Sequence, residues 1–218
     1  MDLSSLLRDR FGFEEFRPAQ KQVIDQIMGG QSALAIMPTG SGKSLCYQLP
    51  ALALPGLTLV VSPLIALMKD QVDQLGHLGL PATLINSSIS REQQRSRLEQ
   101  AIAGRIKLLY IAPERFQNDE FRAGLQRINV SLFAVDEAHC VSLWGHDFRP
   151  DYLRLRGTIR ELKSPPVLAL TATATPAVRR DILKQLGIEG AAEIVSGFDR
   201  PNLYLEVREV GTTAEKIR

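Results

Sequence analysis

The chemistry that this chain could perform is concentrated in residues 37–44, which read Met-Pro-Thr-Gly-Ser-Gly-Lys-Ser. They follow an apolar run, 33–36, that is typical of a buried strand. Gly40 and Gly42 allow a tight turn in which successive backbone N–H groups face one centre, and that arrangement binds phosphate. The sequence therefore predicts a P-loop, with a helix that begins at the second glycine or the lysine after it and ends near Leu52.

Two side chains of this loop have separate tasks in nucleotide binding. Lys43 would reach the β- and γ-phosphates, and the Ser44 hydroxyl would complete the coordination shell of a magnesium ion. The usual pattern begins with glycine, so we expect Met37 to lie at the end of the strand rather than in the turn. The alternative is a chance Gly-Lys-Ser in an ordinary strand-to-helix turn. The candidates for nucleotide binding are Met37, Pro38, Thr39, Gly40, Ser41, Gly42, Lys43 and Ser44.

A pair of adjacent carboxylates forms the second candidate site. Asp136 and Glu137 follow four apolar residues, so they should emerge at the carboxyl end of a central strand, where ligands bind in open α/β sheets. Asp136 suits the magnesium shell, and Glu137 is placed to orient or deprotonate the attacking water. A strand that ends in acidic residues is common, but its combination with a P-loop favours nucleotide hydrolysis.

A cluster of aromatic and polar residues lies ahead of the P-loop strand. The Gln20 amide both donates and accepts hydrogen bonds, which suits the edge of adenine, while Phe13 and Arg17 could sandwich the ring by stacking and cation–π contact. Such aromatic residues alone more often belong to the core. The P-loop downstream favours the adenine interpretation.

Apolar strands and helical patterns alternate along the chain. Connections of this length imply right-handed crossovers and a parallel sheet with helices on both faces, so the predicted fold class is α/β. Ser90 is expected to cap one of the helices. The predicted strands are 33–36, 57–62, 83–86, 107–111, the run before Asp136, and 203–210; the predicted helices include 2–10, 64–76 and 177–186.

Composition limits the remaining function classes. A formal net charge of +2 over 218 residues announces no large basic face, so any nucleic-acid contact must come from local clusters. Cys46 and Cys140 form neither a disulfide framework nor a Cys/His cluster, so we expect no zinc within this chain. The N-terminal segment lacks a secretion signal, and no apolar run is long enough for a membrane span, so we expect neither secretion nor membrane contact.

Residues 136–139 read Asp-Glu-Ala-His, a DEAH box, and together with several other motifs they resemble the superfamily 2 helicases. The loop 144–150, Trp-Gly-His-Asp-Phe-Arg-Pro, is similar to the aromatic-rich loop of the RecQ DNA helicases, and the resemblance spans essentially the whole chain. The other matching motifs are 11–20, 37–44, 62–71, 110–115, 171–174 and 198–202.

This resemblance implies a RecA-like P-loop NTPase lobe of an ATP-dependent DNA helicase that translocates 3′ to 5′ in DNA repair and recombination. It implies that Gln20 and Arg17 recognise adenine and that Phe13 stands where the family often has tyrosine. It further implies that His139 links the ATP site to the DNA side, and that Thr171 and Thr173 couple hydrolysis to unwinding.

The aromatic-rich loop has a physical rationale in DNA binding. Trp144 and Phe148 offer flat faces on which bases stack without sequence preference, while His146 and Arg149 supply charge and hydrogen bonds. A Trp-x-x-x-Phe spacing alone more often packs in a core, but the charged setting between Gly and Pro favours an exposed loop. The family resemblance implies that the loop senses single-stranded DNA and relays this toward Glu137.

Further contacts with DNA are expected from the motifs at 62–71 and 110–115. The Ser62 hydroxyl and nearby backbone amides could bind phosphate oxygens. For Lys69 and Arg115, contact with the strand, solvation, and pairing with Asp73 and Glu114 all remain open.

RecQ-like enzymes bind ATP between two RecA-like lobes, and the second lobe supplies arginine fingers. The predicted organisation is an N-terminal helical segment with the adenine motif, 1–30, an ATP-binding lobe, 31–210, and the polar tail of a truncated chain, 211–218. We therefore expect a monomeric lobe that uses ATP and Mg²⁺, binds single-stranded and partly duplex DNA, and is weakly active without the second lobe in cis. Its expected location is the bacterial cytoplasm (nucleoid) or the eukaryotic nucleus.

Two other functions stay open from the sequence. One is a nucleotide- and DNA-binding interaction module without productive hydrolysis, although the presence of Lys43, Asp136 and Glu137 disfavours it. The other is a P-loop ATPase that does not bind nucleic acid, which conflicts with the loop 144–150.

Overall fold

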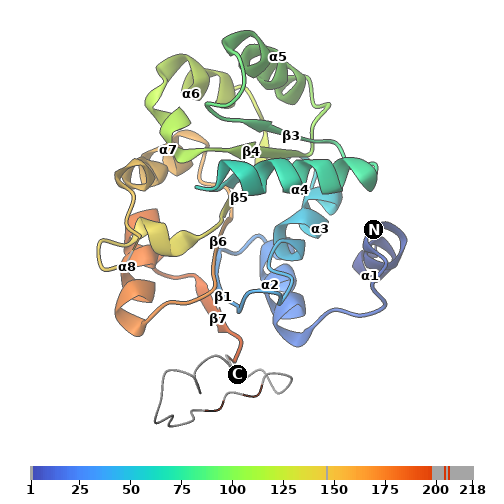
Figure 1. The fold of residues 1–218 in the computed structure, drawn as a ribbon, viewed down its shortest axis with the longest axis vertical. Helices are drawn as coiled ribbons and strands as arrows, with labels where there is room; N and C mark the ends of the chain where they lie inside the picture. Colours follow the sequence, from blue (N-terminus) through green and yellow to red (C-terminus); the bar gives the residue numbers. More distant parts are fainter. Residues whose placement is uncertain (1, 146, 198–203, 205, 207–218) are drawn as a thin grey trace, which may run out of the picture.

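The structure is a computed structural model that describes residues 2–145, 147–197, 204 and 206. Its centre is a seven-stranded sheet in which all paired strands are parallel, in the order β3-β4-β2-β5-β6-β1-β7 (Figure 1). The parallel sheet confirms the α/β prediction. The strands are β1 Ala33–Ile36, β2 Leu57–Val61, β3 Ala82–Ile85, β4 Leu108–Ile111, β5 Val130–Val135, β6 Val167–Thr171 and β7 Ala192–Val195.

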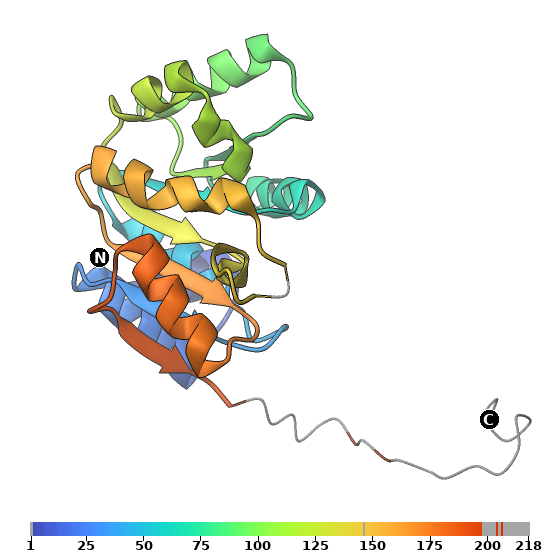
Figure 2. The ribbon, with the colours of Figure 1, turned by 90° about the vertical axis from the view of Figure 1, so that its left-hand side faces the viewer.

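Helices cover both faces of the sheet (Figures 1 and 2). One face packs against α2 (Pro18–Met28), α3 (Leu45–Ala53) and α4 (Ile65–His77). The other face packs against α5 (Arg91–Ile102), α6 (Asp119–Leu125), α7 (Leu155–Glu161) and α8 (Pro176–Leu186). Single turns of 3₁₀-helix occupy Pro113–Gln117, Ala138–Val141 and Pro150–Arg154.

Six of the seven strands are buried along nearly their whole length, and most of their residues are apolar. The edge strand β7 is the exception, because only Ile194 is buried in it. In β5, Phe133 and Val135 join the core beneath α5–α8, whereas Leu132 and Ala134 join the core beneath α2–α4. All four side chains are fully buried. Complete burial of one large apolar side chain stabilises the fold by about 1.5–3 kcal/mol, so this strand anchors both layers.

The N-terminal segment is less regular than the predicted helix over 2–10. Only Leu3–Leu6 (α1) is α-helical, and Leu7–Phe11 continues as a wider π-helical turn. The Asp2 side chain caps α1 by accepting hydrogen bonds from the N–H groups of Ser4 and Ser5. Leu7 is fully buried against α2 and α3, so this segment packs on the core although its α-helix is shorter than predicted.

Several predicted element bounds differ from the observed ones. The helix after the P-loop begins at Leu45, because Gly42 has a positive φ of 81° that no α-helix accepts. Strand β7 was not predicted from the sequence, and it pairs with β1 at the edge of the sheet. The predicted strand 203–210, the motif 198–202 and the tail 211–218 lie outside the described residues, except for Tyr204 and Glu206.

The order of the strands brings the chemical motifs to one edge. Strands β5, β6 and β1 are neighbours, and their carboxyl ends lead into the DEAH box, Thr171 and the P-loop. The ladder extends beyond the strands, because the Met37 N–H donates to the Thr171 carbonyl at 3.0 Å and the Asp136 N–H donates to the Val61 carbonyl at 2.8 Å. The three motifs are therefore held together at one edge of the sheet by backbone hydrogen bonds.

Membrane insertion has no support in the helices described here. None of them combines the length and the apolar character that a bilayer crossing requires.

Candidate nucleotide-binding site

The P-loop has the backbone conformation that its glycines predict. Gly40 and Gly42 have φ angles of 79° and 81°, in the left-handed region that favours glycine. Met37 is only 1% exposed and packs in the core beneath α2–α4, which confirms that it ends the strand and does not enter the turn. The Ser41 N–H donates to the Pro38 carbonyl at 3.1 Å and closes the turn.

Two polar groups of this loop are suited to a phosphate group. The Lys43 ammonium is folded over its own loop, where Nζ donates to the carbonyls of Met37 at 3.0 Å and Pro38 at 3.3 Å. The Ser41 hydroxyl is buried and has no hydrogen-bond partner among the residues that the structure describes. A bound phosphate would give this hydroxyl an acceptor and would attract the ammonium away from two neutral carbonyls.

Two of the three residues predicted to recognise adenine contact the P-loop from the start of α2. The Arg17 guanidinium donates to the Gly40 carbonyl at 2.8 Å. Gln20 is 5% exposed, and its Nε2 donates to the carbonyls of Ser41 at 3.1 Å and Gly42 at 3.3 Å. Phe13 is 56% exposed, which leaves its ring face accessible for stacking.

The Gln20 side chain already has partners at both ends of its amide. Its Oε1 accepts a hydrogen bond from the Arg17 N–H at 2.9 Å, and its Nε2 bonds the loop carbonyls. Recognition of adenine by this amide stays a prediction, because it requires at least one of these hydrogen bonds to be exchanged. The sequence did not indicate that Gln20 also forms hydrogen bonds with carbonyl groups of the P-loop.

The two carboxylates follow β5 in an unusual backbone conformation. Glu137 has φ 48° and ψ 47°, the left-handed region that costs a non-glycine residue about 1–3 kcal/mol. The Asp136 carboxylate accepts a hydrogen bond from the Glu137 N–H at 3.0 Å, which helps to hold this turn. Glu137 Oε2 lies 3.3 Å from His139 Nδ1 as a result of the turn.

The environment shifts the pKa values of the two carboxyl groups in opposite directions. Burial, followed by the nearby Glu137 charge, raises the pKa of Asp136 to about 6. The hydrogen bond with His139 lowers the pKa of Glu137 below its usual value, against the opposing effect of burial. A buried carboxylate gains from a cation, and Asp136 and the Ser44 hydroxyl offer the oxygen ligands that Mg²⁺ prefers, so these residues fit the predicted magnesium site.

A chain of hydrogen bonds connects the DEAH box to the next strand of the sheet. His139 Nδ1 lies 3.0 Å from the Thr171 hydroxyl, which in turn donates to the Thr173 carbonyl at 3.1 Å. Thr171 is fully buried, so this contact is shielded from water. The structure therefore brings together Glu137, His139, Thr171 and Thr173, the residues predicted to link hydrolysis to the DNA side.

The aromatic-rich loop is partly exposed. Trp144 is 78% exposed, whereas Phe148 is half-buried and His146 lies outside the described residues. The Arg149 guanidinium donates to the Pro63 carbonyl at 3.4 Å and pairs with Asp147 at 3.3 Å. Trp144 thus has the accessible face that base stacking requires.

Ser62, the predicted phosphate ligand, is buried, whereas Trp144 is exposed. It is 2% exposed, and its hydroxyl is buried with no hydrogen-bond partner in the described part of the chain. The contact with a DNA phosphate stays a prediction that requires the neighbouring chain to move. Lys69 is exposed and forms no ion pair with Asp73. The Arg115 guanidinium lies 5.5 Å from the centre of the Phe121 ring. The predicted alternative in which these two cations pair with Asp73 and Glu114 is therefore not observed.

A residue that the sequence did not single out supports this loop. Asp181 on α8 accepts hydrogen bonds from the Ser142 hydroxyl at 2.8 Å and the Leu143 N–H at 2.9 Å. Ser142 Oγ accepts in turn from the Trp144 N–H at 3.2 Å. Asp181 stands outside every recognised motif, on a helix whose spacing indicates only amphipathic packing, so the sequence held no signal for it.

The chain is similar to known helicases over most of its length. It is 47% identical to "ATP-dependent DNA helicase RecQ" of Haemophilus influenzae over 98% of this chain and 34% of the relative. It is 51% identical to the protein of the same name from Bacillus subtilis over 93% of this chain and 35% of the relative. The chain therefore spans about a third of the length of these relatives.

A solved structure and a family model also match the chain, and both belong to helicases. The helicase domain of Pyrococcus furiosus Hef superposes with a TM-score of 0.65 and 25% identity, covering 86% of this chain and 39% of that one. The family model for the DEAD/DEAH box helicases matches residues 17–182, which include the P-loop, the DEAH box and Thr171. The chain belongs to the DEAD/DEAH box helicase family and is similar to the RecQ helicases within it.

Proposed function

We propose that this chain is the nucleotide-binding motor lobe of an ATP-dependent DNA helicase that translocates 3′ to 5′. The observation that carries the proposal is the contact of His139 with both Glu137 and Thr171, at 3.3 Å and 3.0 Å, between the nucleotide site and the segment that leads to Trp144. The names of the RecQ relatives support the same activity. Roles in DNA repair and recombination follow from the resemblance.

The residues around the P-loop would divide the binding of ATP among them. Backbone N–H groups and Lys43 would bind the phosphates, while Phe13, Arg17 and Gln20 would hold the adenine ring. Magnesium, held by Ser44 and Asp136, would neutralise charge on the phosphate oxygens. Glu137, whose lowered pKa keeps it ionised at neutral pH, would orient the attacking water and accept its proton.

Coupling to DNA would run through the short segment between the DEAH box and the aromatic-rich loop. The Gly145 N–H donates to the Ser142 carbonyl at 3.0 Å, and the Arg149 N–H donates to the Cys140 carbonyl at 3.0 Å, so the loop is tied to the residues beside His139. A base stacked on Trp144 would pull on this segment and change the position of His139 against Glu137. Single-stranded and partly duplex DNA are the proposed partners.

The proposal includes a second RecA-like lobe that completes the nucleotide site. Arginine fingers raise the rate of phosphoryl transfer about 10³–10⁵-fold in this class of reaction, so the lobe alone should turn over slowly. We propose that it is a monomer, and that the protein works in the bacterial cytoplasm, at the nucleoid, or in the eukaryotic nucleus.

Two substitutions test these roles by separating nucleotide binding from hydrolysis. Lys43→Ala should abolish binding of a fluorescent ATP analogue, whereas Glu137→Gln should bind it normally and hydrolyse ATP about 10²–10⁴-fold more slowly than the unmodified chain. Hydrolysis at an unchanged rate in Glu137→Gln would overturn the role of Glu137. Binding without any turnover, with the second lobe supplied, would instead support a binding module that lacks productive hydrolysis.

A further inference from the structure

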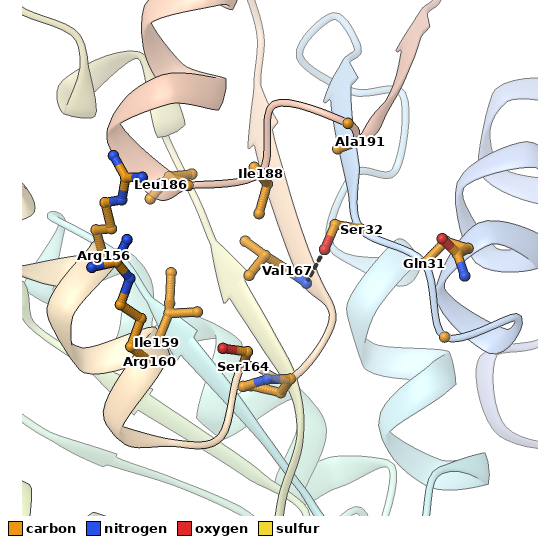
Figure 3. A pocket seen from close by; sticks show the side chains of 14 residues that line it. Gln31, Ser32, Arg156, Ile159, Arg160, Ser164, Val167, Leu186, Ile188 and Ala191 are labelled. Atoms are coloured by element: carbon orange, nitrogen blue, oxygen red, sulfur yellow. Dashed lines mark hydrogen bonds between the residues drawn. The ribbon is translucent and has the colours of Figure 1, made fainter.

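A pocket lies at the edge of the sheet opposite the nucleotide site (Figure 3). It has a volume of about 340 Å³, and segments that lead into β1, β6 and β7 line it, together with α7 and the end of α8. The P-loop and the DEAH box instead follow the carboxyl ends of their strands. The pocket therefore belongs to neither ATP binding nor the proposed DNA contacts.

Two arginines make this pocket strongly basic. Arg156 and Arg160 are four residues apart on α7 and lie on one side of the pocket, with Gln31 and Ser32 on the other (Figure 3). The described residues that line the pocket include no acidic side chain, and neither arginine forms an ion pair with any of them or with the rest of the described chain. Two guanidinium groups with uncompensated charge create a site for an anion.

Arg156 is held in place while keeping hydrogen-bonding capacity. Its Nη1 donates to the Lys184 carbonyl at 3.2 Å, and its stem packs on Gly187, where an added methyl group would lie 3.0 Å from Nε. Nε itself is buried, and none of the described residues offers it an acceptor. A donor of this kind, fixed by its neighbours, loses little entropy when an anion binds.

The floor between the two polar sides is aliphatic. Ile159, Val167, Leu186 and Ile188 supply it, and the lining residues that the structure describes include no aromatic side chain on which a nucleobase could stack. The Ser32 hydroxyl accepts from the Val167 N–H at 2.9 Å and keeps its own proton for donation (Figure 3). The pocket thus offers hydrogen-bond donors around an apolar floor.

We propose that this pocket binds an acidic peptide segment of a partner protein. A carboxylate would pair with Arg156 and Arg160, and a neighbouring aliphatic side chain would cover Ile159, Val167 and Ile188. The volume fits one or two side chains, so the contact is small and its affinity is modest and salt-sensitive. The proposal does not depend on the function proposed above, because the partner could bind while ATP and DNA occupy the other edge.

The test begins with a random heptapeptide library displayed on phage. It is selected on the 218-residue chain and counter-selected on the double variant Arg156→Gln, Arg160→Gln. The expected result is enrichment of sequences in which Asp or Glu stands beside Leu, Ile or Val. Enrichment of basic sequences, or no sequence that distinguishes the two proteins, would overturn the proposal.

The affinity of one enriched peptide is then measured by fluorescence anisotropy. Binding should weaken about tenfold or more in Arg160→Gln and in the double variant, and it should stay unchanged in Arg154→Gln, which removes an exposed arginine outside the pocket. Nucleotide binding should be equal in all variants, which verifies that each one folds. Equal peptide affinity in the double variant and in Arg154→Gln would contradict the assignment.

A final arm separates the peptide from nucleic acid. A labelled single-stranded oligonucleotide should bind the unmodified chain and the double variant equally well. If the double variant instead loses DNA binding and the peptide does not compete, the arginines form a phosphate-binding surface and the peptide proposal is wrong.

Discussion

The Gln20 amide nitrogen lies 3.3 Å from the Gly42 carbonyl oxygen and would clash with a methyl group added at Gly42. Gly42 is therefore needed for two separate reasons: its φ of 81° disfavours any side chain, and Gln20 occupies the space that a side chain would fill. The start of α2 thereby fixes the shape of the P-loop.

This relationship predicts the effect of Gly42→Ala. Backbone strain should cost about 1–3 kcal/mol, and the added methyl group should displace the Gln20 side chain from the loop. Gly104→Ala is the matched control, because Gly104 has a φ of 70° and no atom near its absent side chain. We expect both variants to lose stability, Gly42→Ala more so because Gln20 must also move, and we expect a loss of affinity for fluorescent nucleotide only in Gly42→Ala. Equal nucleotide affinity in the two variants would contradict the role of Gln20.

Trp144→Ala should weaken binding of single-stranded DNA. Stacking of one base contributes about 1–3 kcal/mol, so the dissociation constant measured by anisotropy should rise roughly 5- to 150-fold. Leu153→Ala is the control, because Leu153 is another exposed apolar residue, at 45% exposure against 78% for Trp144. Nucleotide affinity should stay the same in both variants. An unchanged DNA affinity in Trp144→Ala would mean that the loop does not stack on bases.

Asp181→Ala should uncouple DNA from hydrolysis without damaging the nucleotide site. It removes the acceptor for Ser142 and Leu143, so the base of the aromatic-rich loop should move more freely. Hydrogen exchange at the Leu143 and Trp144 amides should accelerate, and stimulation of ATP hydrolysis by DNA should fall, while unstimulated hydrolysis is kept. Lys184→Ala, an exposed change on the same helix, should alter neither quantity. Unchanged, slow hydrogen exchange at these two amides in Asp181→Ala would show that Asp181 does not hold the base of the loop.

The imidazole of His139 should make stability depend on pH. Hydrogen bonds to Cys140 and Glu137 raise the pKa of His139 to about 10 from an ordinary value of 6.5. Protonation therefore stabilises the folded state fully below pH 6.5, and this contribution disappears as the pH rises toward 10. The difference in unfolding free energy between the unmodified chain and His139→Gln should be largest at pH 6 and should shrink steadily up to pH 10. A difference that does not change with pH would show that His139 is neutral in the fold.

The sequence predicted the motifs well because each one is local. Strand β1, the glycine turn and the buried Met37 all follow from neighbouring residues, and so do the apolar run and the carboxylates of the DEAH box. The start of α3 was placed too early because the motif was expected to run directly from the glycine turn into the helix, whereas the positive φ of Gly42 prevents a start there.

Relationships between distant segments could not be predicted from the pattern alone. Asp181 contacts Ser142 because α8 packs beside the turn after the DEAH box, and nothing in the α8 sequence distinguishes Asp181 from an ordinary surface residue. The short strand β7 lacks a strong apolar run, and it forms because β1 offers it a free edge. The engagement of Gln20 with the P-loop carbonyls is likewise a product of tertiary packing.

The most direct test of the motor-lobe proposal is ATP hydrolysis by the 218-residue chain, measured with and without single-stranded DNA and alongside binding of a fluorescent nucleotide. The account predicts magnesium-dependent nucleotide binding that Lys43→Ala abolishes, slow turnover, and a rise in turnover when a second RecA-like lobe is supplied. Failure of the chain to bind nucleotide would contradict the nucleotide site itself. Rapid DNA-stimulated turnover by the chain alone would contradict the requirement for a second lobe.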